Sequence, residues 1–295
     1  MSSPPNPRRE HPSTYFVQDR SNQDELTRLQ LQDESTTLAM GGTLPEQSDP
    51  ERFQRILDIG CGTGNWLLEV AQTYPTISLL VGVDISGRMI EYAQSQALAR
   101  GLDKRVQFHT MDVLRVLEFP NHFFDLVNQR FATSYLRTWD WPRLMQEYQR
   151  ILRFGGILRL TEGDFAMEGT SPALVQLIDL LRDAFAQAGH FFDVHSNGIA
   201  TDLVHVLTRY GFHDIQSREY NQVVRAGTSQ GDHLVEDMRL AFRTTVPFLR
   251  KWSNLPDNYE AIYQQMVNET QQPNFATTGL MITAWGRKPP KEENL

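Results

Sequence analysis

The chain has 295 residues, enough for one large α/β domain with insertions or for two small domains. Its 28 Lys and Arg residues against 36 Asp and Glu residues give a net charge of −8, which argues against sequence-independent binding to nucleic-acid phosphates. Hydrophobic residues make up 40% and charged residues 22% of the chain, as in globular proteins, and no apolar run approaches the roughly 20 residues of a membrane-spanning helix.

The single cysteine, Cys61, excludes an internal disulfide and a cysteine-based metal site. The proline-rich N-terminus has no apolar stretch of the kind found in secretion signals. We therefore expect a cytoplasmic protein that does not insert into a membrane and has no nucleic-acid partner.

Residues 1–45 are expected to form an N-terminal tail and a helical lid. The first dozen residues contain four prolines and show no periodicity, which predicts a frayed tail. Residues 24–40 carry leucines among polar residues and end at Gly41 and Gly42, a pattern that predicts an amphipathic helix.

Residues 46–295 are expected to form the main domain, because strand and helix patterns alternate along its first part. The predicted strands cover residues 55–59, 79–84, 106–111, 124–127 and 156–161, and the predicted helices between them cover residues 65–73, 89–100 and 141–152. Two later strands, 212–224 and 278–285, are expected to pair as an antiparallel hairpin. The predicted fold is α/β: a doubly wound, mostly parallel seven-stranded sheet with an antiparallel last strand.

Two helical insertions are expected, at about residues 166–196 and 228–275. The first contains an amphipathic helix that starts at Pro172. The second contains two helical stretches and many aromatic residues, and is too long for a simple loop. Both insertions are expected to serve as lids over a ligand site.

The sequence Asp58-Ile59-Gly60-Cys61-Gly62-Thr63-Gly64 lies where a buried strand meets a helix. Glycines in such a loop allow a ligand to approach the backbone, because they lack a Cβ atom. A dinucleotide-binding loop needs the spacing Gly-x-Gly-x-x-Gly, but here the third glycine comes one residue early. Asp58 would repel a pyrophosphate and suits a cationic ligand. The loop therefore favours a cationic, nucleotide-like cofactor over NAD, which stays a minor alternative.

Residues 58–64 resemble the first motif of the class I S-adenosylmethionine-dependent methyltransferases, and Val83-Asp84 resembles their second motif. Met111-Asp112-Val113 resembles the segment that holds the adenine in that family. The resemblance covers about residues 53–160 and is closest to the ubiquinone/menaquinone-type small-molecule methyltransferases. It implies a Rossmann-like fold, S-adenosyl-L-methionine as cofactor and S-adenosyl-L-homocysteine as product.

The same resemblance implies a set of cofactor-binding residues. Asp84 is expected to accept hydrogen bonds from both ribose hydroxyls, and Asp112 from the exocyclic amine of adenine. The full set expected to bind the cofactor is Tyr15, Asp58, Gly60, Gly62, Gly64, Asp84, Ile85, Met89, Met111, Asp112, Val113, Asn128 and Gln129.

Candidate catalytic residues are sought at the carboxyl ends of the strands, where open α/β sheets bind ligands. Methyl transfer is an in-line displacement, so the enzyme mainly aligns the reactants and needs a base only for a protonated nucleophile. Glu162, Asp164 and His195 are the candidates for a base or an orienting group. The alternatives are that the two carboxylates are simply solvated and that the histidine contacts helix-terminal carbonyls.

Arg130, Phe131 and Tyr135 are expected to bind the substrate, Arg130 through an acidic group of the substrate. The alternative for Arg130 is an ordinary salt-bridged arginine. No metal is expected, because position 128 is Asn and the surroundings do not match a magnesium-dependent enzyme.

The predicted function is transfer of a methyl group to the O, C or N atom of a small, hydrophobic or aromatic metabolite. One alternative is a protein of the same fold that binds the cofactor and catalyses cyclisation, or only binds. A lesser alternative is a protein or RNA methyltransferase. The only partner expected is the small-molecule substrate, and homo-oligomerisation through the N-terminal helix or the insertions is left open.

Overall fold

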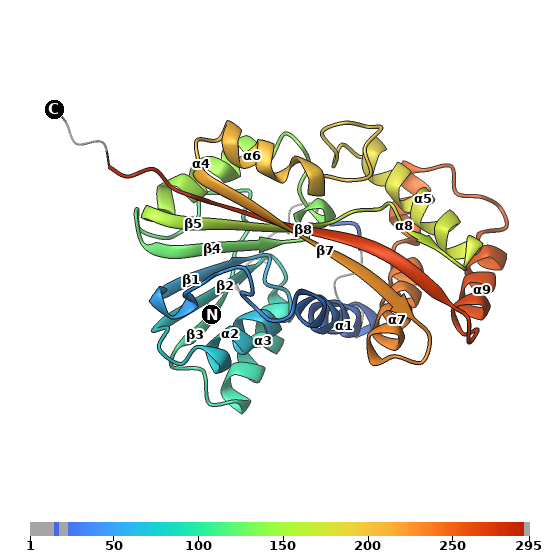
Figure 1. Ribbon diagram of the computed structural model, residues 1–295, viewed down its shortest axis with the longest axis horizontal. Coiled ribbons are helices and arrows are strands. Elements are labelled where there is room, and N and C mark those ends of the chain that lie inside the picture. The colour runs from blue at the N-terminus through green and yellow to red at the C-terminus, as the bar shows by residue number, and fades with distance from the viewer. Residues whose placement is uncertain (1–14, 18–22, 292–295) are drawn as a thin grey trace, which may run out of the picture.

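We describe the protein from a computed structural model (Figure 1). The structure describes residues 15–17 and 23–291. The predicted tail therefore falls almost wholly outside the described residues, and so does the end of the chain, residues 292–295.

A mixed sheet of eight strands forms the centre of the molecule. Its strands are β1 (Arg55–Ile59), β2 (Leu79–Asp84), β3 (Val106–Thr110), β4 (Phe124–Arg130), β5 (Leu152–Gly163), β6 (Glu168–Gly169), β7 (His213–Arg225) and β8 (Ala276–Arg287). The order is β3-β2-β1-β4-β5-β8-β6, and β7 pairs with β8. Strands β1 to β5 pair in parallel, whereas β8 is antiparallel to β5, β6 and β7. The seven predicted strands are confirmed, and the structure adds the two-residue strand β6.

The helices lie where the sequence pattern predicts them. They are α1 (Gln23–Met40), α2 (Asn65–Thr73), α3 (Gly87–Ala99), α4 (Trp141–Ile151), α5 (Pro172–Gln187), α6 (Leu203–Arg209), α7 (Ser229–Thr244), α8 (Val246–Trp252) and α9 (Tyr259–Thr270), with short 3-10 helices η1 (Pro50–Arg52), η2 (Ala132–Ser134) and η3 (Ala200–Asp202). The second insertion contains three helices instead of the two predicted. A new helix starts after Thr245 because Pro247, in its first turn, has no N–H to donate to the preceding helix.

Both faces of the parallel sheet are buried. In β1, Leu57 and Ile59 belong to one hydrophobic core, whereas Ile56 belongs to a second core on the opposite face. Successive side chains of a strand point to opposite faces, so such strands need helices on both sides. The doubly wound arrangement is therefore confirmed.

Helices α1, α5, α7, α8 and α9 gather at one end of the sheet (Figure 1), whereas α6 packs on β7 and β8. Helix α1 packs along α7, and α5 packs against α8 and α9. This end is where the parallel strands finish. Among the described residues, no helix is long and apolar enough to cross a lipid bilayer.

Candidate functional site

A cavity of about 400 Å³ lies at the carboxyl ends of the parallel strands. Residues that follow or end β1 to β5 line one side of it, among them Gly60, Asp84, Met111, Arg130 and Glu162. Helices α1, α5 and α7 line the other side. This is the crevice in which open α/β sheets bind their ligands.

The glycine loop has a backbone that other residues rarely adopt. Gly60, Gly62 and Gly64 have φ values of +66°, +51° and +73°. Gly60 and Gly62 line the cavity, but Gly64 does not. A Cβ atom on Gly64 would lie 2.5 Å from the ring of Phe108, so this glycine serves the packing of α2 against β3. The predicted contact of Gly64 with the cofactor is therefore not supported.

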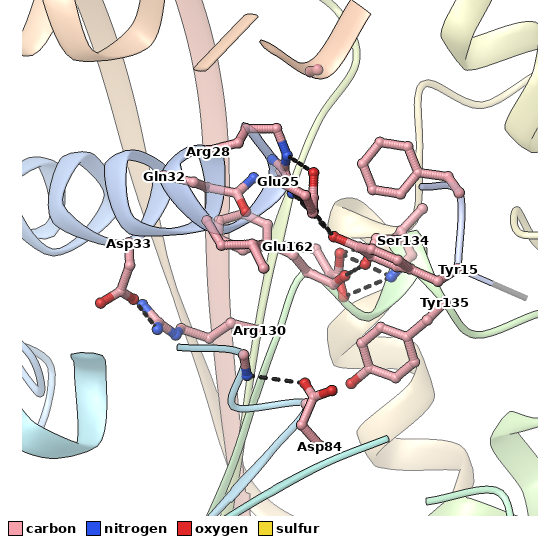
Figure 2. A pocket seen from close by; sticks show the side chains of 18 of the residues that line it. Tyr15, Glu25, Arg28, Gln32, Asp33, Asp84, Arg130, Ser134, Tyr135 and Glu162 are labelled. Carbon is pink, nitrogen blue, oxygen red and sulfur yellow. Dashed lines mark hydrogen bonds and ion pairs between the residues drawn. The ribbon is translucent and has the colours of Figure 1, made fainter. Parts of the chain in front are cut away.

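Asp84 ends β2 with its carboxylate on the cavity wall (Figure 2). Its Oδ2 accepts a hydrogen bond from the backbone N–H of Gly62 at 3.0 Å, and its Oδ1 accepts one from the N–H of Ser86 at 2.8 Å. The two bonds tie the second motif to the glycine loop and hold the carboxylate in one orientation.

The predicted adenine segment also reaches the cavity. Met111, Asp112 and Val113 line it together with Ile85 and Met89. The Oδ1 of Asp112 accepts a hydrogen bond from the N–H of Leu114 at 3.0 Å. Apolar side chains next to a fixed carboxylate suit a flat heterocycle that donates a hydrogen bond.

Asp58 is buried on the cavity wall, whereas Asn128 and Gln129 lie behind the wall. The Nδ2 of Asn128 donates to Asp58 Oδ1 at 2.7 Å, and the Oε1 of Gln129 accepts from the hydroxyl of Tyr148 at 2.5 Å. Burial raises the pKa of Asp58 to about 7, against the opposing effects of Arg130 and the Asn128 hydrogen bond. The predicted cofactor contacts of Asn128 and Gln129 are not supported, because neither residue lines the cavity.

Glu162 is the penultimate residue of β5 and reaches across to η2. Its Oε1 accepts from the N–H of Ala132 at 2.6 Å, and its Oε2 accepts from the hydroxyl of Thr133 at 2.9 Å. Burial raises the pKa of Glu162 to about 8, and these hydrogen bonds oppose the rise. The carboxylate lines the cavity and at the same time anchors the segment that carries Ser134 and Tyr135 (Figure 2).

The two other catalytic candidates have different surroundings. Asp164 lines the cavity, and its Oδ1 accepts from the N–H of Ala166 at 2.8 Å. His195 is exposed and lies outside the cavity wall, in a turn where its N–H donates to Asp193 Oδ1 at 2.9 Å. The structure does not support the predicted role of His195 as a base, because the loop after α5 carries this residue to the surface.

Arg130 forms an ion pair with Asp33 of α1 (Figure 2). Its guanidinium also lies 5.5 Å from the ring centroid of Trp66. The pair is almost fully buried, so Arg130 ties α1 to the end of β4. Arg130 also lines the cavity, and its contact with an acidic group of the substrate stays a prediction. Phe131 and Tyr135 do line the cavity, as predicted.

A buried polar cluster joins α1 to α7 on the cavity wall, and sequence reasoning missed most of it. Glu25 accepts from the hydroxyl of Tyr15 at 2.5 Å and from Arg28 Nε and Nη2, each at 2.8 Å. Arg28 Nη1 donates to Asp237 Oδ1 at 3.1 Å. Burial raises the pKa of Asp237 to about 6, although Arg28 lowers it. The spacing of Glu25 and Arg28 on one helix face could have signalled a pair, but the partner on α7 could not be foreseen.

Apart from Gln32 of α1, the rest of the wall on the lid side is apolar. The residues are Leu29, Phe165, Met167, Ile178, Leu181, Phe185, Met238, Ala241 and Phe242. The site thus has a polar half at the strand ends and a mostly apolar half under the helices, where the charged side chains form ion pairs.

The sequence matches known methyltransferases. A protein-family model described as "Methyltransferase domain" matches residues 56–156. The aklanonic acid methyltransferase DauC of Streptomyces sp. (strain C5) is 32% identical over 166 residues, which are 54% of this chain and 73% of that protein. A demethylmenaquinone methyltransferase of Porphyromonas gingivalis is 32% identical over 115 residues, which are 39% of this chain but only 45% of that protein.

Two solved structures share the fold at 18% identity and a TM-score of 0.50. The YcgJ protein from Bacillus subtilis matches over 81% of this chain and 93% of its own, and the cyclase SpnF over 95% and 99%. Because a cyclase has this fold too, the fold alone does not separate methyl transfer from cyclisation, and the sequence relatives decide. The motifs, the cavity at the strand ends and the relatives agree that the chain belongs to the class I S-adenosylmethionine-dependent methyltransferases.

Proposed function

We propose that this methyltransferase acts on a small, largely apolar metabolite that is enclosed between the strand ends and helices α1, α5 and α7. The observation that carries the proposal is one cavity in which the motif residues supply polar groups at the strand ends, whereas the lid side is mostly apolar apart from Gln32, Asp33 and the paired Glu25, Arg28 and Asp237. Binding sites for small molecules combine apolar walls with a few placed polar groups in this way.

The polar half suits the cofactor. We assign Asp84 to the ribose hydroxyls, because Gly62 and Ser86 hold its carboxylate on the cavity wall. We assign Asp112 to the adenine and Asp58 to the cationic end, where a buried carboxylate attracts positive charge. When bound, the cofactor supplies a methyl group on a positively charged sulfur, and the chain's own residues have to align the acceptor and exclude water.

The two cavity carboxylates of β5 and its following loop receive different roles. Glu162 is proposed as a positioning residue for Phe131 and Tyr135, because η2 already occupies both of its oxygens. Asp164 is proposed to orient the acceptor, or to take its proton where the acceptor arrives protonated. Asp164 is half-buried on the wall and has a single hydrogen bond to its own loop within the described residues.

The charges on the wall favour a neutral or cationic substrate. Arg28 and Arg130 are the basic residues on the wall among those described, and carboxylates occupy both. The acidic residues on the wall are Glu25, Asp33, Asp58, Asp84, Asp112, Glu162, Asp164 and Asp237. An anionic substrate would therefore face mostly like charge, and would have to compete with the carboxylates that are paired with Arg28 and Arg130.

We also propose a cytoplasmic enzyme that works without a metal. The amide of Asn128, at the position where a carboxylate ligand would be sought, is hydrogen-bonded to Asp58 and Arg159. In the part of the chain that the structure describes, no group of three or more His, Cys, Asp or Glu side chains is arranged to hold a metal ion. The solitary cysteine fits a reducing compartment.

The proposal is tested with methyl-labelled S-adenosylmethionine and a panel of apolar metabolites in matched neutral, cationic and anionic forms. We expect label in a neutral or cationic product, release of S-adenosylhomocysteine in equal amount, and loss of both in Asp84→Ala. A product of unchanged mass without S-adenosylhomocysteine would show that this chain catalyses cyclisation instead. Label in anionic compounds alone would refute the proposed substrate class.

A further inference from the structure

A row of buried polar side chains crosses the sheet from Asp58 on the cavity wall. Asp58 on β1, Asn128 on β4 and Arg159 on β5 are direct register neighbours on three adjacent strands. Asn128 Nδ2 donates to Asp58 Oδ1 at 2.7 Å, and Arg159 Nη1 donates to Asn128 Oδ1 at 2.7 Å. A buried Asn and a buried Arg inside a sheet need such partners.

Glu46 ends the row on the far side. It lies between α1 and β1 in the chain, and it accepts from Arg159 Nε at 2.7 Å and from Nη2 at 3.3 Å. Both side chains of this ion pair are 0% exposed. The Arg159 guanidinium also lies 5.9 Å from the ring centroid of Trp66. Neither Arg159 nor Glu46 is among the described residues that line the cavity.

Arg159 determines which way the amide of Asn128 points. A guanidinium only donates hydrogen bonds, so the amide oxygen has to face Arg159 and the amide nitrogen has to face Asp58. Without Arg159, the amide could turn its oxygen toward Asp58, and two acceptors would then oppose each other. The orientation that favours an ionised Asp58 therefore depends on a residue outside the cavity.

We propose that Arg159 and Glu46 are positioning residues for cofactor binding, which act through Asn128 to keep Asp58 in the ionised form that receives the cationic end of the cofactor. The inference rests on the proposed function of Asp58. Glu46 contributes by holding Arg159 in place, since an unpaired buried guanidinium would seek other partners.

The other groups around Asp58 act in both directions. Arg130 of β4 favours the ionised form, and Asp33 of α1 opposes it. Among the described residues, Cys61, Tyr135 and Tyr148 also interact electrostatically with Asp58. Burial raises the pKa of Asp58 to about 7, and Arg159 is among the groups that lower it. Loss of the row should therefore raise this pKa further.

The test is the affinity for S-adenosylhomocysteine, measured by calorimetry between pH 6 and pH 8.5. The variant is Arg159→Met combined with Glu46→Leu, which removes both charges and leaves neither unpaired. In the native protein we expect affinity to fall as Asp58 takes up a proton at low pH. In the variant, the midpoint of this pH dependence should move to higher pH by about one unit. The variant should therefore bind S-adenosylhomocysteine about three- to tenfold more weakly than the native protein at pH 7, and almost equally well at pH 8.5.

Arg153→Met is the matched control. Arg153 is also on β5 and pairs with Asp125 of β4 at 2.7 Å, but it is half exposed and outside the row. The affinity of the Arg153→Met variant for S-adenosylhomocysteine should change with pH as it does in the native protein. Should the double variant fail to fold, Arg159→Lys keeps the charge without the forked guanidinium and should give a smaller shift in the same direction.

Two results would overturn the inference. The first is a pH dependence of affinity in the double variant with the same midpoint as in the native protein. The second is an equal loss of affinity at every pH, which indicates a purely structural role. Native affinity that does not change with pH would instead refute the proposed role of Asp58 itself. The two failures are therefore distinguishable.

Discussion

At the scale of single residues, the three loop glycines have different tasks. All three need positive φ, but they differ in what a side chain would meet. A Cβ atom on Gly64 would overlap the ring of Phe108 at 2.5 Å, whereas the atom nearest to one on Gly62 is Leu29 Cδ1 at 3.7 Å. Gly64 therefore serves the fold, and Gly62 serves the surface that a ligand approaches.

This difference predicts separate effects of two alanine substitutions. Gly64→Ala should lower the free energy of unfolding by about 2 to 4 kcal/mol, from backbone strain plus overpacking. Gly62→Ala should cost about 1 kcal/mol, from strain alone, but should weaken binding of S-adenosylhomocysteine. Denaturant unfolding and calorimetry measure the two effects.

Gly101→Ala is the control for strain. Gly101 has φ +66°, and a Cβ atom there would meet nothing within 4 Å. We expect Gly101→Ala to lose as much stability as Gly62→Ala, and to bind S-adenosylhomocysteine as tightly as the native protein does. Equal unfolding free energies for Gly62→Ala and Gly64→Ala would contradict the assignment.

At the scale of elements, two buried ion pairs hold α1 in place. Arg28 joins it to Asp237 on α7, and Asp33 joins it to Arg130 at the end of β4. A helix that is anchored by buried charges on two sides has a defined position, because each charge is costly without its partner. This explains how α1 becomes part of the cavity wall.

Arg28→Met should destabilise the protein by about 3 to 5 kcal/mol at neutral pH, because it leaves Glu25 and Asp237 buried without their cation. The loss of unfolding free energy relative to the native protein should grow as the pH rises. The pKa of Asp237 is raised to about 6 even beside Arg28, and would rise further without it. A carboxyl with a raised folded-state pKa favours folding at low pH, and this contribution is lost as the pH rises through that pKa.

The measurement is the difference in Tm between the native protein and the variant at pH 5 and pH 8. Arg243→Met is the control, since Arg243 also joins α7 to α1, through Asp24 at 3.7 Å, but is largely exposed. It should change stability by about 0.5 kcal/mol or less. An Arg28→Met deficit that is the same at both pH values would contradict the prediction.

At the scale of the whole molecule, segments far apart in the chain enclose one cavity. Helix α1 precedes the sheet, α5 follows β6, and α7 lies between β7 and β8, yet all three line the same wall. Their shared position supports the proposal that they act together as a lid, which would exclude water and hold the acceptor near the methyl group.

Hydrogen exchange tests the lid. Binding of S-adenosylhomocysteine together with a substrate analogue should slow exchange in α1, α5 and α7 in parallel, while α6, outside the cavity wall, should change little. If only the strand ends gain protection, the helices are a static wall and the lid proposal is wrong.

The sequence by itself determined the parts that depend on local pattern. Strands β1 and β2 and helix α2 have the predicted bounds, because apolar runs, glycines and helical spacing are local signals. The motif residues Asp84 and Asp112 reach the cavity for the same reason: each lies where a parallel strand ends, and those ends meet at one edge.

Only the tertiary structure decided which polar side chains face the cavity and which are committed to partners. Arg130 meets Asp33, 97 residues away, and Arg28 meets Asp237, 209 residues away. Asn128 and His195 were both predicted to belong to the site, but Asn128 lies behind Asp58 and His195 lies at the surface. Contacts across such separations depend on how whole elements pack, and no periodicity within a segment encodes them.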